Sequence, residues 1–577
     1  MARTVADGIW DMLSAAGVRR CYGIVGDALN PMIDALRRNG TIEFVHVRHE
    51  EYGAFAAVAE ACLTGQPVAV CGTAGPGTTH LINGLLDARK ERAPVIAVAG
   101  DVENALMDTA AHEELNPYTF FAAASLYTAR LVDPGQLRAV VSTAVTTAVA
   151  ERGPTVLSVP GSVAAAAAPD AELGVALPAT VPGPASESDL SAMAALVDAA
   201  ESVAVFGGDG CAHAHAETRA LAERLKAPVG YSLKGKQWLE HDNPNAVGMT
   251  GLLGYGGCYD AIHRADLLLM LGTDCPYSNF LPQHGVKVVQ VDRDPHVLGR
   301  RVPLALGVVG DVRTTLQALL PRVQPKTDDA LLRHCLRETE RFLARMQHYV
   351  TKGPGIKPIR PEFVAATLDA LAADDALFFA DTGTPVIWAA RHIRYGRDRR
   401  LFGSFAWGSM ANASPNAFGA QTAFPGRQTI ALCGDGGFTM LALGDLLTEV
   451  RRKAEVVHVI FNNGMLDFVN IEQQEAGLLP FGTDFPTPDF RRFAEAFGAR
   501  GIRIEEPGEV EAGLRDALAH RGGPVVVDIV VDPNALSLPS HVPPAVLKGF
   551  TQSAARQVFQ GRLDDIIETV ERNVRLL

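Results

Sequence analysis

The chain has 577 residues, of which 47% are hydrophobic and 20% charged, a composition that predicts three or four globular domains and excludes disordered and fibrous proteins. The formal net charge of −13 leaves no surplus of Lys and Arg to neutralise phosphates, so we expect no nucleic-acid partner.

Cysteine usage and the N-terminus both favour a cytoplasmic protein. The eight cysteines include no C-x-x-C pair and mostly lie in apolar runs, which predicts buried reduced thiols and neither disulfides nor a zinc site. The first residues carry acidic groups and lack a basic start followed by an apolar block, so we expect no secretory signal.

Apolar β-type runs, each followed by a Gly-containing turn and a helical pattern, recur along the whole chain. Strands that are apolar throughout and alternate with helices predict parallel sheets covered on both faces. The stretches 162–188 and 351–361 are typical of linkers. We therefore predict three doubly wound α/β domains and a tail, over residues 1–180, 188–340, 360–530 and 531–577.

The N-terminal unit carries acidic residues at a predicted helix start. The run IEFVHVRHEEYGAFAA ends a strand and opens a helix, which places Glu50 and Glu51 in the first turn. Carboxylates are favoured there whatever else they do, so the position alone leaves a structural role open. Further along come the turn Gly75-Pro76-Gly77 and the loop AGDVENALMDTAAHEELNPYTFF, which contains His112.

The middle unit begins with a strand that leads into FGGDGCAH. This sequence falls short of G-x-G-x-x-G because position 213 is His, so the dinucleotide fingerprint is not met.

The C-terminal unit has the strongest local signal. The strand TIALC leads into Gly434-Asp435-Gly436-Gly437, and the next strand, VVHVIF, leads into Asn462-Asn463. Two parallel strand ends thus present Asp435 and Asn463, whose oxygens suit Mg²⁺. The glycines let the backbone approach a diphosphate, whose charge a helix N-terminus favours.

GDG followed by NN at the end of the next strand is the signature of thiamine diphosphate (ThDP) enzymes, and the sequence resembles that family over nearly its whole length. The resemblance implies that Asp435 and Asn463 bind Mg²⁺ through their side chains and Met465 through its backbone carbonyl. The cofactor-binding residues that it implies are Glu50, Gly75, Gly408, Ser409, Met410, Gly434, Asp435, Gly436, Gly437, Asn463, Met465 and Leu466.

Two of these residues have specific roles in the family that the chain resembles. Glu50 matches the glutamate that one subunit supplies to the cofactor of its neighbour, where a carboxyl of raised pKa shares a proton with N1′ of the aminopyrimidine. Met410, in the sequence GSM, matches the residue that forces the cofactor into a bent shape, although Met is otherwise a common core residue. The resemblance implies at least a dimer, and a homotetramer is expected.

The middle unit resembles the FAD domain of the pyruvate oxidases and of the bacterial quinone-linked pyruvate dehydrogenase. The matching stretches are LKGKQWLEHDNPNAVGMTGLLG, LLLMLGTDCPYSNFLP and KVVQVDRDPHVLGRR. The resemblance implies that the first loop and the GTDCP turn contact the flavin and that an acid after the next strand holds the adenosine ribose. These residues are Thr250, Gly251, Leu252, Leu253, Gly272, Thr273, Asp274, Cys275, Pro276 and Asp292.

The segment FNNGMLDFVNIEQQEAG extends the same resemblance into the C-terminal unit. Phe468 and Glu472 match positions linked in the oxidases to electron transfer between the cofactors, although core packing also explains an aromatic residue at 468.

The tail resembles the segment by which the quinone-linked enzyme meets the membrane, which predicts a peripheral association with the inner face of the cell membrane. Its helical pattern places apolar residues on one face, but acidic residues offset its arginines and weaken attraction to anionic lipid. Docking of the tail on the protein's own surface is the alternative. The apolar face consists of Leu563, Ile566, Ile567, Val570 and Val574.

Two positions depart from the oxidase pattern. Ala111-His112-Glu113 stands where the oxidases carry Phe-Gln-Glu in the substrate pocket, and Asp467 stands where they usually have Gly. An imidazole at this position changes the size of the pocket and adds a group that can donate or accept a proton near neutral pH, so His112 is a candidate catalytic residue. An exposed loop position without a catalytic role is the alternative explanation of His112.

The resemblance to the pyruvate oxidases favours the hypothesis that the protein catalyses oxidative decarboxylation of pyruvate, or a related 2-oxo acid, to acetate and CO₂. It requires ThDP, Mg²⁺ and FAD, with a quinone as the electron acceptor. The alternative hypothesis is a non-oxidative decarboxylase or a carboligase similar to acetolactate synthase, in which FAD is structural. A third hypothesis is a non-catalytic relative that only binds the cofactors.

Overall fold

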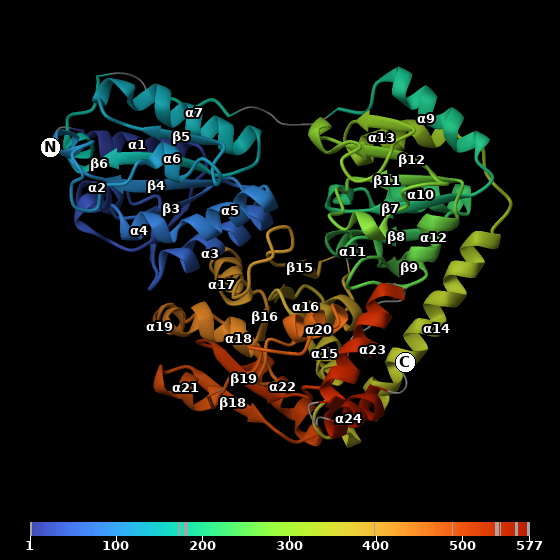
Figure 1. Cartoon of the computed structure of the whole chain (residues 1–577). Coiled ribbons are helices and arrows are strands. Elements are labelled where there is room, and N and C mark those ends of the chain that lie inside the picture. The colour runs from blue at the N-terminus through green and yellow to red at the C-terminus, as the bar shows by residue number, and fades with distance from the viewer. Residues whose placement is uncertain are drawn as a thin grey trace.

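The computed structural model describes residues 3–170, 173–177, 183–396, 398–486, 488–536, 542, 544–559 and 563–573. Three sheets of six or seven strands follow one another along the chain, each with helices on both faces (Figure 1). The blue N-terminal domain and the green middle domain lie side by side above the orange C-terminal domain. The prediction of three doubly wound α/β domains with a helical tail is confirmed, while the boundaries drawn from linker composition stay predictions.

The N-terminal domain has a parallel sheet in the order β2-β1-β3-β4-β6-β5. Its strands are β1 (Arg20–Gly23), β2 (Glu43–His46), β3 (Val68–Gly72), β4 (Val95–Asp101), β5 (Tyr127–Arg130) and β6 (Thr155–Pro160). Its helices are α1 (Val5–Ala15), α2 (Asn30–Asn39), α3 (Glu50–Thr64), α4 (Pro76–His80), α5 (Ile82–Glu91), α6 (Pro117–Phe120), α7 (Leu137–Ala150) and α8 (Gly161–Ala165).

The sheet of the middle domain has the order β10-β9-β8-β7-β11-β12-β13. Its strands are β7 (Val203–Gly207), β8 (Val229–Tyr231), β9 (Ala246–Met249), β10 (Tyr255–Gly256), β11 (Leu267–Leu271), β12 (Lys287–Asp292) and β13 (Leu306–Val309). Its helices are α9 (Glu187–Ala199), α10 (His215–Leu225), α11 (Leu233–Leu239), α12 (Cys258–Arg264), α13 (Val312–Leu319) and α14 (Ala330–Lys352).

Two features of the middle domain correct the sequence interpretation. The sheet is not wholly parallel, since β10 pairs with β9 in the antiparallel sense, because the turn between them is too short for a parallel crossover. In addition, α14 runs past residue 340 and ends within the stretch predicted as a linker. Its buried Phe342, Met346 and Tyr349 recur at helical spacing, a pattern that outweighs the Gly and Pro of the following turn.

The sheet of the C-terminal domain is parallel, in the order β15-β14-β16-β17-β19-β18. Its strands are β14 (Leu377–Ala380), β15 (Arg400–Phe402), β16 (Thr429–Gly434), β17 (Val456–Asn462), β18 (Arg500–Ile504) and β19 (Val525–Val530). Its helices are α15 (Pro361–Leu371), α16 (Thr384–His392), α17 (Ala413–Ala423), α18 (Asp435–Gly437), α19 (Leu443–Arg452), α20 (Asp467–Glu475), α21 (Phe490–Ala496) and α22 (Val510–Ala519).

The N- and C-terminal domains pack together through α3 and α17. A Cβ atom at Gly419 of α17 would lie 2.0 Å from the Ala56 carbonyl oxygen, so only glycine allows this approach of the two backbones. The Tyr52 hydroxyl donates to Glu449 at 2.5 Å, and Glu449 also bonds the buried His458 at 2.7 Å. This buried network fixes the N-terminal end of α3, where Glu50 lies, relative to the C-terminal sheet.

The tail forms α23 (Pro544–Phe559) and α24 (Leu563–Asn573), drawn in red in Figure 1. Helix α23 packs on α20, where the Ser553 hydroxyl and the Arg556 guanidinium donate to the carbonyls of Leu478 and Gly477, both at 2.6 Å. Helix α23 therefore docks on its own chain, whereas Ile567 and Val570 of the predicted apolar face in α24 are exposed, and the membrane contact stays a prediction. Of the predicted apolar face, Val574 and the Leu563 side chain lie outside the described residues. None of the helices in the described ranges has the length and apolar content needed to cross a membrane.

Arg360 anchors the tail and the end of β19 in the core of the C-terminal domain. Its side chain is 1% exposed, donates to Glu362 at 2.6 Å and to Asp532 at 3.4 Å, and lies over the Tyr349 ring. The Asn573 amide oxygen of α24 accepts from the same guanidinium at 3.4 Å.

We expect Arg360→Met to lower the free energy of unfolding by about 3–5 kcal/mol, because it leaves the buried Glu362 carboxylate without the guanidinium that binds it, while Asp532 keeps Arg572. Thermal and denaturant unfolding of the two proteins measure the difference. Arg37→Met is the control, since its exposed pair with Asp34 should contribute about 0–1 kcal/mol. An Arg360 variant as stable as wild type would contradict the anchoring role.

Candidate active site

Asp435 and Asn463 lie side by side where the neighbouring strands β16 and β17 end. Asp435 is 2% exposed, and its Oδ2 atom accepts from the backbone N–H groups of Asn463 at 3.0 Å and Gly464 at 2.7 Å. Its Oδ1 atom accepts from the N–H of Gly436 at 2.7 Å. Burial raises the pKa of Asp435 to about 6, and these backbone donors oppose the rise.

This donor set fits Mg²⁺. Within the described structure, the hydrogen bonds to Asp435 come from backbone N–H groups and not from a Lys or Arg side chain. A buried carboxylate without a full countercharge is costly, and a divalent cation supplies that charge. Asn463 adds an amide oxygen, which here accepts from the N–H of Met465 at 3.2 Å. Octahedral Mg²⁺ would keep positions for phosphate and water, and the ligand assignment itself stays a prediction.

Gly436 lies against three apolar side chains. A Cβ atom at this position would lie 2.7 Å from Leu466, 3.3 Å from Phe485 and 3.6 Å from the Met410 methyl group. Met410, which is predicted to bend the cofactor, and Leu466, which is predicted to contact it, therefore meet at the turn formed by Gly434-Asp435-Gly436-Gly437. The segment that carries Leu466 is held by a short antiparallel pairing, in which the Leu466 N–H donates to the Thr483 carbonyl at 2.7 Å.

The remaining predicted residues of this domain surround the same turn. Gly434 ends β16 and Gly437 follows it in α18, where a Cβ atom would lie 2.4 Å from an Asp381 carboxylate oxygen. Gly408, with a φ of 83°, and Ser409 precede Met410 in the loop between β15 and α17. These glycines leave room for a diphosphate to approach the backbone.

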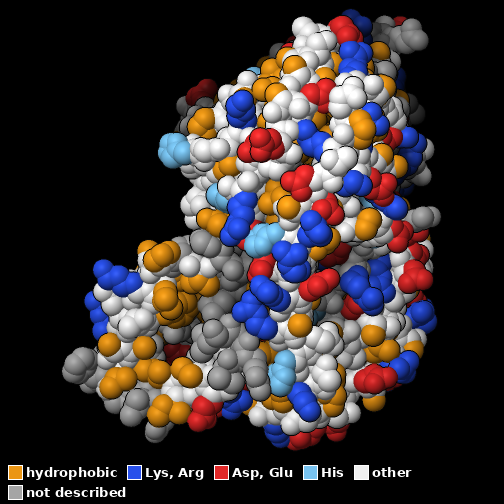
Figure 2. All heavy atoms as spheres, turned by 90° about the vertical axis from the view of Figure 1, so that its right-hand side faces the viewer, with side chains coloured by type: hydrophobic (Ala, Val, Ile, Leu, Met, Phe, Trp, Pro, Cys, Tyr) orange, Lys and Arg blue, Asp and Glu red, His pale blue; other side chains and the backbone are white. Residues whose placement is uncertain are grey.

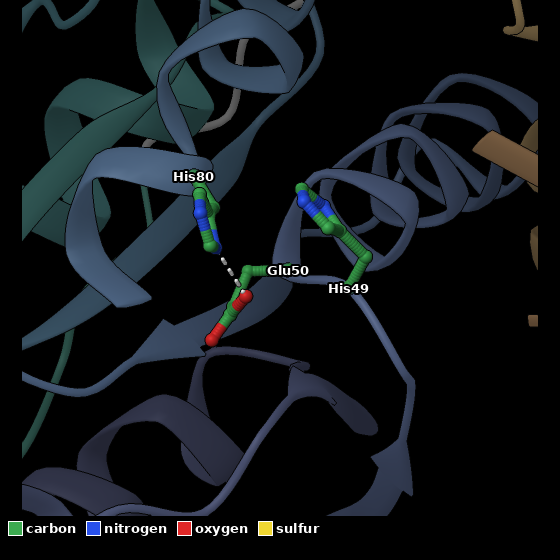
Figure 3. A group of neighbouring side chains, drawn as sticks. All are labelled: His49, Glu50 and His80. Atoms are coloured by element: carbon green, nitrogen blue, oxygen red, sulfur yellow. Dashed lines mark hydrogen bonds and ion pairs between the residues drawn. The ribbon is translucent and has the colours of Figure 1, made fainter. Parts of the chain in front are cut away.

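Glu50 is the first residue of α3 and only 5% of it is exposed. Its carboxylate lies 2.9 Å from Nδ1 of His80, and the His80 ring stacks on that of His49 with centroids 4.4 Å apart (Figure 3). The turn that starts at Gly75 lies next to Glu50, since a Cβ atom at Gly77 would be 3.1 Å from a Glu50 oxygen. Glu50 is thus a buried carboxyl with an imidazole partner, and its predicted contact with a neighbouring subunit's cofactor stays a prediction.

The loop with His112 lies beside this turn. A Cβ atom at Gly75 would be 3.0 Å from the Glu113 side chain, which places the loop against the turn that borders Glu50. The His112 side chain is 96% exposed and lies 3.7 Å from Glu113. In the single chain His112 is therefore exposed, as the alternative reading has it, and its predicted catalytic role stays a prediction.

The predicted flavin residues gather at one end of the middle sheet. Thr250, Gly251, Leu252 and Leu253 form the turn after β9, the stretch from Gly272 through Thr273, Asp274 and Cys275 to Pro276 follows β11, and Asp292 ends β12. Asp292 is 8% exposed, and burial raises its pKa.

Two observations test whether these residues fit a bound flavin. The Thr250 hydroxyl is buried and has no hydrogen-bond partner within the described structure, so it is available to a ligand. A Cβ atom at Gly272 would lie 2.5 Å from the Gly210 backbone. These two glycines therefore allow the turns that follow β7 and β11 to lie against each other. Asp274 differs from its neighbours because Arg300 and Arg301 already bind its carboxylate, at 3.0 and 3.1 Å.

Helix α20 carries Phe468 and Glu472, the two residues predicted to take part in electron transfer. It starts at Asp467, directly after Met465 and Leu466, and burial raises the pKa of that Asp to about 7. Phe468 packs against the C-terminal core and Glu472 is exposed. Burial raises the pKa of Tyr277 in the middle domain, with smaller contributions from Cys275 and Glu472.

Sequence reasoning missed three residues of the site. Asp381 follows β14 and accepts from the N–H groups of Ala413 at 2.8 Å and Gly434 at 3.3 Å; its position after an apolar strand was a usable signal. His80 belongs to a helix pattern that gives no hint of its contact with Glu50. Phe485 lies in an irregular segment, and only the tertiary pairing with Gly464 places it at Gly436.

Three family models match the chain, each for a thiamine pyrophosphate enzyme, which is another name for a ThDP enzyme. The N-terminal binding domain matches residues 3–120, the central domain 190–319 and the C-terminal binding domain 381–529.

Full-length relatives agree with these matches. A Bacillus subtilis protein named YdaP, described as thiamine pyrophosphate-containing, is 32% identical over 97% of both chains. The pyruvate oxidase of Lactiplantibacillus plantarum is 29% identical over 90% of this chain and 87% of its own. The acetolactate synthase of Mycobacterium bovis is 30% identical over 98% of this chain and 93% of its own. The chain belongs to the thiamine diphosphate enzyme family.

Proposed function

We propose that this enzyme decarboxylates pyruvate, or a close 2-oxo acid relative, and passes two electrons to a bound FAD. In the balanced reaction, pyruvate, water and a quinone give acetate, CO₂ and the quinol, and bound FAD would supply the carrier for the two electrons. The observation that carries the proposal is the buried Thr250 hydroxyl at the predicted flavin loop, which has no hydrogen-bond partner within the described structure and belongs to the same chain as the candidate metal site.

Bound ThDP would supply the electron sink that accepts the electron pair of the broken carbon–carbon bond. The chain's own residues would bind and orient it. Asp435 and Asn463 would hold Mg²⁺ and through it the diphosphate, and Met410 would fix the bend of the cofactor. Glu50 would move a proton at N1′, for which a buried, poorly solvated carboxyl is suited.

The support for FAD lies in the middle domain. Thr250 offers a buried hydroxyl without a partner in the described structure, and the Gly272 turn gives close backbone access. Thr273 and Asp292 lie at the same sheet end, where parallel α/β sheets bind ligands. Pyruvate oxidase among the relatives agrees with a redox-active flavin.

A carboligase reaction is the second candidate. Relatives named acetolactate synthase are as similar to this chain as the pyruvate oxidase is, and His112 and Asp467 depart from the oxidase pattern. In that case FAD would be structural and the product an acetohydroxy acid.

Anaerobic addition of pyruvate to the purified, ThDP- and Mg²⁺-loaded protein distinguishes the two reactions. We expect the flavin absorbance at about 450 nm to bleach, with acetate as the product. A flavin that stays oxidised while an acyloin forms would favour the carboligase, and a protein without flavin would overturn the oxidase proposal. The homotetramer, the quinone and a membrane contact stay predictions.

A further inference from the structure

Helix α5 of the N-terminal domain directs three polar side chains at the loop that carries Met410. Asn83, Asp87 and Glu91 recur every four residues and therefore share one face of the helix. Residues 403–410 of the C-terminal domain, which we call the wedge loop, lie along that face in the same chain.

Each of the three side chains bonds the wedge loop. Asn83 Oδ1 accepts from the indole N–H of Trp407 at 2.7 Å, and its amide donates to the Ser409 hydroxyl at 3.1 Å. Asp87 accepts from the Ser404 hydroxyl at 2.7 Å. Glu91 accepts from the Ala406 N–H at 2.8 Å.

The centre of this arrangement is buried. Asp87 and Ser404 are 0% exposed, and the Ser404 oxygen that donates to Asp87 also accepts from the Ser409 N–H at 3.0 Å. The contact therefore closes the wedge loop on itself one residue before Met410. The second carboxylate oxygen of Glu91 accepts from Lys234 of the middle domain at 2.7 Å. The same helix face therefore also contacts the domain predicted to bind flavin.

Most of the wedge loop has no regular secondary structure, and its residues from Ala406 to Gly408 are exposed. Without outside support such a segment would sample many conformations. Charge-assisted hydrogen bonds are among the stronger ones that a protein makes, and Glu91, which also pairs with Lys234, supplies one of the three contacts.

We propose that Asn83, Asp87 and Glu91 are positioning residues that hold the wedge loop, and with it Met410, in the conformation that binds ThDP. The inference rests on the proposed role of Met410 at the cofactor, and it assigns a function to α5 that is separate from the redox reaction. Because the bonds run within one chain, each subunit orders its own wedge loop.

The test measures ThDP affinity by calorimetry in the presence of Mg²⁺, with the full-length protein and without substrate. We expect Asp87→Ala to weaken ThDP binding roughly tenfold to a hundredfold, because it leaves the buried Ser404 hydroxyl without its acceptor. Asp87→Asn should restore most of the affinity, since its amide oxygen still accepts from Ser404. Lys90→Ala is the control: it lies exposed on the same helix and should bind ThDP like wild type.

Ser404→Ala removes the same bond from the loop side and serves if Asp87→Ala does not fold. When Asp87→Ala and Ser404→Ala are combined, the loss of ThDP-binding free energy should be much smaller than the sum of the two single losses, because both changes break the same hydrogen bond. Unchanged ThDP affinity in the single variants, even with a lower melting temperature, would overturn the proposal, as would fully additive losses. Because no substrate is present, failure of pyruvate to bleach the flavin would overturn the proposed function alone.

Discussion

Glu50→Gln should lower turnover roughly 10²–10⁴-fold while ThDP affinity changes little, because the amide keeps the shape of the side chain but cannot exchange a proton at N1′. The environment of Glu50 supports this role. It is buried, and its hydrogen-bonding partner His80 lies 2.9 Å away on a different helix. Steady-state turnover, measured next to calorimetric ThDP binding, separates loss of chemistry from loss of cofactor.

Glu51→Gln is the matched control for this experiment. Glu51 lies one residue along in the same first turn of α3, so the change to Gln removes charge at the helix N-terminus in the same way, and the amide oxygen of Gln still accepts from Asn83. We expect its turnover to stay within a few-fold of wild type by comparison with the much larger effect at Glu50. Equal effects at both positions would mean that the carboxylates only stabilise the helix, and full activity of Glu50→Gln would remove its catalytic assignment.

The metal site was predictable from the sequence because its geometry follows from local rules. Asp435 and Asn463 each follow an apolar strand, and parallel strands that pair side by side bring such residues to one edge of the sheet. The contact between Glu50 and His80 was not predictable in the same way. Both residues follow strands, but the sheet order that places β1 between β2 and β3 decides that their side chains meet.

Other features depended on packing between domains. The spacing of Asn83, Asp87 and Glu91 is typical of a solvated helix face, and the approach of the C-terminal and middle domains buries Asp87 and Glu91. The course of α14 was missed for the opposite reason, since turn-forming residues near its end hid an amphipathic period that was present in the sequence. Local patterns therefore identified the elements and the cofactor class, whereas the supporting contacts required the tertiary structure.

Asp435→Ala should abolish Mg²⁺-dependent binding of ThDP, with a loss of affinity greater than roughly a hundredfold. Among the predicted ligands Asp435 is the one carboxylate, and Mg²⁺ binds proteins mainly through one or two carboxylates together with substrate phosphates. Asn463 and a backbone carbonyl, both neutral, cannot replace its charge.

Thermal unfolding with and without Mg²⁺ and ThDP provides the measurement. Ligands that bind only the folded state raise its stability, so wild type should melt at a higher temperature when both are present. Asp435→Ala should show no such rise, while Asp374→Ala, which removes an exposed carboxylate of the same domain, should behave like wild type. A rise in the Asp435 variant equal to that of wild type would place the metal elsewhere. A loss confined to Asp435→Ala would tie metal, diphosphate and the GDG turn to one site, since the neighbouring Gly436 is also where Met410 and Leu466 meet.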